Sequence, residues 1–142
     1  MDIDQYLYSM DKQNNKGMTK QEIYDTVCAH LAKQKTRSMT MDSCSYRGED
    51  NKSCAVGCLI TNDEYDEEMD SIHLITGVRE IFERYPHVAN RIGMDNLPLL
   101  GRLQVAHDTP TSAKDLKLTL SNIAETFQIN KGAEEQITEW NA

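Results

Sequence analysis

The sequence lacks the features that mark several common classes of protein. Its seven glycines are scattered, and neither a G-x-G-x-x-G nor a G-x-x-x-x-G-K phosphate-binding pattern occurs. No apolar stretch approaches the length needed to span a membrane, and the first residues have neither the basic start nor the apolar run of a secretory signal. We therefore expect no membrane association and a cytoplasmic location.

Basic residues are also scarce in this chain of 142 residues. Lys and Arg number 15 against 23 Asp and Glu, which gives a net charge of -8. A broad phosphate-neutralising surface is not available, so the composition argues against direct nucleic-acid binding. An acidic surface favours basic partners, including partners whose nucleic-acid groove it could occupy, although solubility through self-repulsion is the commoner role of such a charge.

The four cysteines lack the spacing of a metal or redox motif. No C-x-x-C pair occurs, which argues against both a structural zinc knuckle and a dithiol redox site. The acidic run from Asp63 to Asp70 offers oxygen ligands for Mg²⁺ or Ca²⁺ but does not match an EF-hand loop. We therefore expect no metal, no cofactor and reduced thiols.

Apolar periodicity predicts a mainly helical chain of about five helices. Thr19 stands three residues before Glu22, the spacing of a capping box, and an apolar stripe then predicts a helix over 20–34. Further stripes predict one helix ending at Pro86, one over 97–107, one that Thr109 or Thr111 caps, and a final stripe that ends at Trp140. Residues 1–17 are predicted to form an N-terminal helical extension, and residues 18–142 a single globular domain.

The segment 43–60 has a different pattern. Two stretches, 43–47 and 53–60, flank a polar stretch that contains Gly48, and this arrangement predicts a β-hairpin. A hairpin centred on Glu49 would place Cys44 opposite Cys54, and Gly57 indicates a bulge or the close approach of another backbone. The predicted fold class is accordingly α+β, with the helices packed around a small hairpin.

Two cysteines could carry nucleophilic chemistry. Either Cys54 or Cys58 could act with His107 as base and Asp108 as its orienting carboxylate, in a cysteine-dependent hydrolase or transferase. A cysteine on a buried strand has a raised pKa, and adjacent residues on a helix project in different directions. No catalytic residue is therefore favoured, and this enzyme is carried as an alternative.

The acidic run and the hairpin beside it supply the candidate binding residues. Carboxylates and aromatic rings gather there, and they are suited to contacts with a protein partner. A second alternative is a protein that sequesters a nucleotide-like molecule, for which Arg47, Arg79, Arg84, Arg91 and Arg102 are available. The candidate binding residues are Tyr46, Arg47, Asp63, Glu64, Tyr65 and Asp66.

Four phrases of the sequence resemble a group of small uncharacterised phage and bacterial proteins. They are C-x-Y-R-G from Cys44, C-A-V-G-C-L-I from Cys54, D-E-Y-D from Asp63 and L-Q-x-x-H-D from Leu103, within residues 19–127. The resemblance implies a phage accessory protein that binds and inhibits a host protein without being an enzyme. This is the leading functional hypothesis, and self-association is left open.

Overall fold

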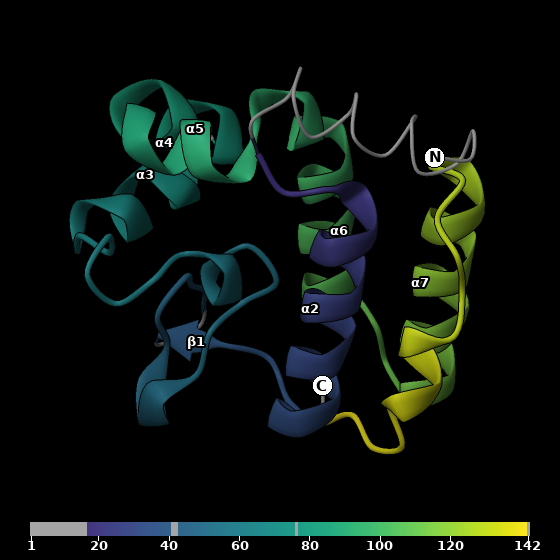
Figure 1. Cartoon of the computed structure of the whole chain (residues 1–142). Coiled ribbons are helices and arrows are strands. Elements are labelled where there is room, and N and C mark those ends of the chain that lie inside the picture. Colours follow the sequence, from purple (N-terminus) through teal and green to yellow (C-terminus); the bar gives the residue numbers. More distant parts are fainter. Residues whose placement is uncertain (1–16, 41–42, 76, 142) are drawn as a thin grey trace, which may run out of the picture.

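A long helix, α2 (Lys20–Gln34), runs through the middle of the structure (Figure 1). The structure is a computed structural model that describes residues 17–40, 43–75 and 77–141. The Thr19 hydroxyl accepts a hydrogen bond from the Glu22 backbone N–H at 3.1 Å, which confirms that half of the predicted capping box, and it donates one to the Glu22 carboxylate at 3.1 Å. The helix ends at Lys35, whose φ of 67° closes it in the left-handed conformation.

The C-terminal part of the chain packs on one side of α2. Helices α6 (Leu97–Asp108) and α7 (Ala113–Thr126) contact each other, and the short 3₁₀ helix η4 (Ala133–Gln136) lies against α2. Ser112 caps α7 by accepting from the Asp115 N–H at 3.1 Å, so the prediction that Thr109 or Thr111 does so was wrong. Trp140 is buried, as expected for a residue at the edge of the core.

Three short helices stand on the other side, where the sequence predicted one. They are α3 (Glu68–Ile75), α4 (Val78–Arg84) and α5 (Pro86–Ile92). Gly77 has a φ of 81°, which a helix cannot continue through, and so it separates α3 from α4. The predicted helix does end before Pro86, since α4 stops at Arg84, and Pro86 then starts α5, because its fixed φ and missing N–H suit a first helical position.

The predicted hairpin over 43–60 is absent, and the α+β class was therefore wrong. Extended pairing among the described residues consists of β1 (Met39–Thr40) with β2 (Ser43–Cys44), where Cys44 stands opposite Met39 rather than Cys54, and one isolated parallel bridge between Thr36 and Asn141. Most of the chain that the structure describes is helical.

Residues 54–60 are a buried helical turn rather than a strand. They include the 3₁₀ helix η2 (Gly57–Leu59), in which Cys58 N–H donates to the Cys54 carbonyl at 3.0 Å and Leu59 N–H to the Val56 carbonyl at 3.0 Å. An uncharged run of this length fits a buried turn as well as a buried strand, so its composition could not distinguish the two.

The apolar side chains form one hydrophobic cluster. It joins α2, η2, α5, α6, α7 and the C-terminal segment, and most of its members have no exposed surface. The predicted helix of the N-terminal extension lies outside the described residues. No helix among the described residues combines the length and the apolar character that crossing a membrane requires.

Candidate functional site

A long irregular segment, residues 45–67, connects β2 to α3 with only two 3₁₀ turns, η1 (Glu49–Asn51) and η2. We call it the connecting loop. Loops of this length without regular structure are uncommon in small domains and are often functional. Buried backbone in such a loop needs hydrogen-bond partners, and here helix-borne side chains supply several of them.

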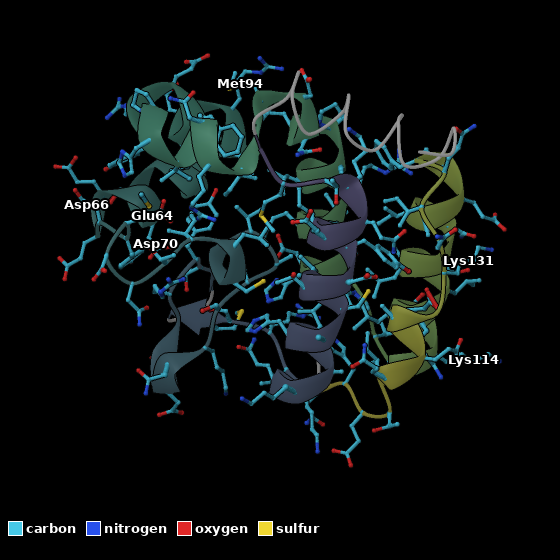
Figure 2. The ribbon with its side chains drawn as sticks, in the orientation of Figure 1. Glu64, Asp66, Asp70, Met94, Lys114 and Lys131 are labelled. Carbon is cyan, nitrogen blue, oxygen red and sulfur yellow. The ribbon has the colours of Figure 1, made fainter. Side chains whose placement is uncertain are left out.

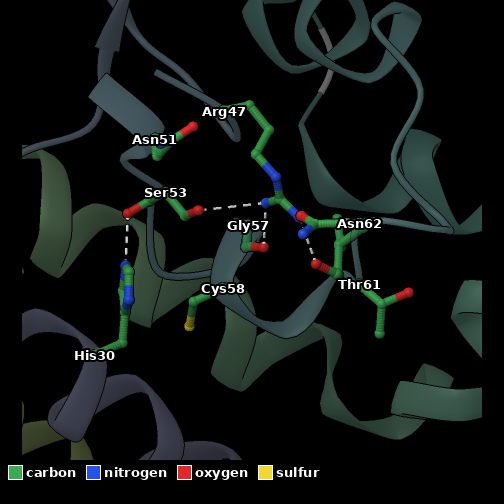
Figure 3. A pocket seen from close by; sticks show the side chains of 9 residues that line it. His30, Arg47, Asn51, Ser53, Gly57, Cys58, Thr61 and Asn62 are labelled. Atoms are coloured by element: carbon green, nitrogen blue, oxygen red, sulfur yellow. Dashed lines mark hydrogen bonds between the residues drawn. The ribbon is translucent and has the colours of Figure 1, made fainter. Parts of the chain in front are cut away.

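Arg47 secures the loop to itself. Its guanidinium donates to the carbonyl oxygens of Gly57 and Ile60, each at 2.6 Å (Figure 3), and lies 5.0 Å from the centroid of the Tyr65 ring. These carbonyls belong to buried residues at the start and the end of η2. A charged, planar donor therefore holds the two ends of this turn together.

Helix α2 holds the middle of the loop through Ser53. The Gln34 side chain accepts from the Ser53 N–H at 2.8 Å and donates to the Ser53 carbonyl at 2.9 Å. The Nε2 of His30 contacts the same carbonyl at 2.7 Å. Both backbone groups of one loop residue are thus bound by two successive turns of α2.

Two carboxylates fix the far end of the loop. Glu64 pairs with Arg91 of α5 at 2.6 and 2.8 Å, and Arg91 also donates to the Leu59 carbonyl at 2.5 Å. Asp70 of α3 accepts from the Tyr46 N–H at 2.6 Å and from the Tyr65 hydroxyl. The loop is consequently attached to α3 and α5 as well as to α2.

His107 and Asp108, the predicted base and its orienting carboxylate, do contact each other, contrary to the expectation that they project apart. His107 Nδ1 lies 2.6 Å from Asp108 Oδ1, and Nε2 accepts from the Ser38 N–H at 2.9 Å. The ring is fully buried and meets Trp140 edge-on, at 6.0 Å between centroids. Because both ring nitrogens are occupied inside the core, this histidine has the environment of a structural residue.

Gln104 extends that network to the connecting loop. Its side chain accepts from the Val56 N–H at 3.1 Å and donates to Asp108 at 3.1 Å. The amide therefore links α6 to the turn that leads into η2. Together with Ser38, these contacts join three separate stretches of chain around one buried histidine.

The two candidate nucleophiles are both poorly placed for attack. Cys54 is fully buried, accepts from the Gly57 N–H at 3.2 Å, and has its thiol pKa raised well above the usual range by burial. Cys58 is partly buried, its thiol donates to the Ala55 carbonyl at 3.0 Å, and burial raises its pKa to about 12. Neither is a thiolate at neutral pH.

Cys58 should consequently be alkylated slowly in the folded protein. At pH 7 we expect iodoacetamide to label it at least about tenfold more slowly than in the same protein unfolded in urea, because the thiolate fraction falls with rising pKa. Peptide mass spectrometry would report each cysteine separately. Equal rates in the folded and unfolded protein would contradict this protection, and a faster rate in the folded protein would support the cysteine-enzyme alternative.

A hollow lies beside Cys58, between α2 and the connecting loop. It measures about 590 Å³ and is lined by His30, Arg47, Ser53, Cys58 and Asn62, among others (Figure 3). The histidine that shares this hollow with a cysteine is therefore His30, not His107, and its Nε2 is bound to a carbonyl. The sequence did not single out His30, Gln34, Ser53 or Gln104 as site residues.

The predicted binding residues do not share one surface. Tyr46 is fully buried, while Arg47, Glu64 and Tyr65 are partly buried and held by the contacts described above. Asp63 and Asp66 are exposed, and Asp66 accepts from the Glu68 N–H at 3.0 Å, ahead of α3. In Figure 2, Glu64, Asp66 and Asp70 lie along the same side of the molecule.

The ion pair of Glu64 with Arg91 should make stability depend on acidity. Hydrogen bonds from Arg91 lower the pKa of Glu64 to about 2, against an ordinary value of 4.5. Since the folded state binds this proton less readily than the unfolded state, the pair stabilises the fold above about pH 4.5 and its contribution is lost as pH falls toward 2.

Replacing Glu64 with Gln should therefore flatten part of the acid limb of the stability curve. Urea unfolding followed by circular dichroism between pH 2.5 and 7 would measure it, with Glu125→Gln as the control. Glu125 pairs with Lys131 at the exposed surface, where such a pair contributes little. Identical acid limbs for Glu64→Gln and the unsubstituted protein would contradict the role given to this pair.

Among the described residues, no three His, Cys, Asp or Glu side chains gather as ligands for a metal ion. Comparisons with protein-family models, curated proteins and solved structures found no match to this chain. The resemblance to small phage and bacterial proteins stays a prediction, and the case for a function depends on the site itself.

Proposed function

We propose that the protein is a non-enzymatic binding protein that holds a basic protein partner on an acidic surface. We define this acidic surface by four exposed carboxylates at the end of the connecting loop and the start of α3, namely Asp63, Asp66, Glu67 and Glu68. None of the four takes part in an ion pair with another described residue. The observation that carries the proposal is that these charges sit on a loop already fixed by other side chains.

A fixed loop favours binding because little conformational entropy is lost when the partner docks. Arg91 with Glu64 and Asp70 with Tyr65 anchor the chain on either side of Asp66. The side chains that do the anchoring are not those offered to the partner. The exposed carboxylates therefore keep their charge available for contacts, while the backbone beneath them is already in place.

The chemistry of the other candidate side chains supports binding over catalysis. The cysteine thiols are protonated and bonded to the backbone, and His107 has both ring nitrogens occupied in the core. The resemblance to phage proteins suggests that the partner is a protein of the host cytoplasm. The acidic surface belongs to a chain with a net charge of -8, so the electrostatic field of the whole protein would attract a basic partner at long range.

Charge reversal tests this proposal. The double variant Asp63→Lys/Glu67→Lys should lose at least about tenfold in affinity for a partner retained from host lysate, since close charge pairs across interfaces contribute above 1.4 kcal/mol. The matched control, Glu135→Lys/Glu139→Lys, makes the same change in net charge at exposed positions near the C-terminus. It should retain the partner.

The partner would be identified by mass spectrometry and its affinity measured with purified proteins at two salt concentrations. Binding through the acidic surface should weaken as salt rises, because exposed charges are screened. If no stoichiometric partner is retained, or if both double variants bind it equally, the proposal is wrong.

A further inference from the structure

A second hollow lies along α2, next to the one beside Cys58. The second measures about 380 Å³ and shares His30 and Asn51 with the first. We call the two together the α2 groove. Each is of a size that binds small molecules in proteins.

The charge of the α2 groove is opposite to that of the protein as a whole. Among the described residues, its lining contains three cationic side chains, Lys33, Arg47 and Lys52, and one carboxylate, Asp50. The chain has an excess of acidic residues, 23 against 15, so a local excess of cations departs from its composition. A positive hollow of this kind concentrates anions.

The side chains between the cations are hydrogen-bonding groups rather than apolar ones. Asn51, Ser53, Thr61 and Asn62 line the groove, whereas Ile60 is the one large aliphatic side chain among its lining residues. Among the residues that the structure describes, no Trp, Tyr or Phe lines either hollow, so these residues offer a nucleobase no ring to stack on there. The lining suits a hydroxylated ligand better than an aromatic one.

Arg47 gives the groove a positive charge that is already in position before a ligand binds. Its terminal nitrogens are fixed by the Gly57 and Ile60 carbonyls, so the guanidinium keeps its position whether or not a ligand is present. Lys33 is exposed and Lys52 is partly exposed, and both have long, flexible side chains that can approach a ligand. The combination of one fixed cation and two mobile ones is suited to a multivalent oxyanion.

We propose that the α2 groove binds a small phosphorylated and hydroxylated molecule of the sugar-phosphate class. The phosphate group would lie among Lys33, Arg47 and Lys52, and the amide and hydroxyl side chains would bind the remainder of the ligand. This site is separate from the acidic surface and does not depend on a protein partner.

The pKa of His30 can serve as a probe of binding in the groove because its side chain lines both hollows. Burial lowers its pKa, the hydrogen bond with the Ser53 carbonyl raises it, and the nearby positive charges of Arg47 and Lys33 lower it further. Asp50 is the acidic residue of the lining. An anion in the groove would oppose the cations, and the pKa of His30 should rise on binding.

The test is an NMR titration of the full chain with inorganic phosphate and with glucose 6-phosphate, at constant ionic strength. We expect saturable shifts of the His30 ring and of the Asn51 and Ser53 amides, with glucose 6-phosphate binding more tightly than phosphate. Lys33→Gln/Lys52→Gln should weaken both by about tenfold or more, as expected for the loss of two charged contacts.

The control is Lys114→Gln/Lys131→Gln, which removes the same charge from the C-terminal side of the molecule, where Figure 2 labels both lysines. It should bind as the unsubstituted protein does. Absence of saturable shifts at His30, or equal weakening by the two double variants, would overturn the proposal. Either result leaves the acidic surface untouched, so this test and that of the protein partner can fail independently.

Discussion

Replacing Gly57 with Ala should destabilise the protein by about 3 kcal/mol or more, at the upper end of the range for overpacking a core. A Cβ atom at this position would lie 2.3 Å from the Tyr46 carbonyl oxygen and 3.0 Å from two further backbone atoms of the same residue. Backbone cannot turn aside as a flexible side chain can. The two parts of the connecting loop would therefore separate at the point where they are closest.

Gly101→Ala is the matched control. An added Cβ there meets nothing within 4 Å, and the residue lies inside α6. Since alanine is favoured over glycine in helix interiors, this variant should gain up to about 1 kcal/mol. Urea unfolding of both variants would measure the difference, and a Gly57→Ala protein as stable as the original would contradict the packing of the loop.

The second large effect is expected from Arg47→Met. This change keeps the length and apolar character of the stem but removes the hydrogen bonds to the Gly57 and Ile60 carbonyls and the contact with the Tyr65 ring. Each bond to a charged donor contributes about 1.5–3 kcal/mol, and partial exposure to water reduces the loss. We therefore expect a destabilisation of about 3 kcal/mol.

Arg84→Met provides the comparison for Arg47→Met. Arg84 makes an exposed pair with Glu80 on the same helix, at 3.0 Å, and such pairs contribute about 0.3–0.5 kcal/mol. The free energies of unfolding should therefore differ by more than about 2 kcal/mol between the two variants. Similar values would show that Arg47 does not hold the two ends of η2 together.

Helix α2 shows what could be predicted from the sequence. The Thr19 and Glu22 pair and the apolar stripe after it are local signals, and both the start and the end of the helix agree with the structure. The close approach of a backbone to Gly57 was also predicted, and it is confirmed by Tyr46. The sequence could not identify Tyr46 as the residue that approaches Gly57, because that contact is not local in the chain.

The uncharged run 53–60 shows where prediction from the sequence fails. Three of its hydrogen-bond partners, Gln34, His30 and Gln104, come from helices 19 or more residues away. Side chains that bind a distant backbone leave no periodic signal, and these three were not assigned a role. The amide of Gln104, between the apolar Leu103 and Ala106, is the sequence feature that comes closest to indicating such contacts, because a buried amide needs hydrogen-bond partners.

The two proposed sites share this loop as their scaffold. The acidic surface lies at its end, and the α2 groove lies along its middle. A binding surface built on a loop keeps its geometry only if the loop is fixed. The contacts of Arg47, Gln34, Gln104 and Asp70 are therefore the common requirement of both proposals.

Native-state amide hydrogen exchange tests this requirement most directly. The amides of Tyr46, Ser53 and Val56 each donate to a side chain of a helix, at 2.6, 2.8 and 3.1 Å. We predict that they exchange only through opening reactions that cost nearly as much as global unfolding, while those of the exposed turn at Asn62 and Asp63 exchange rapidly. Rapid exchange at all five positions would mean that the connecting loop is not fixed, and would contradict the account.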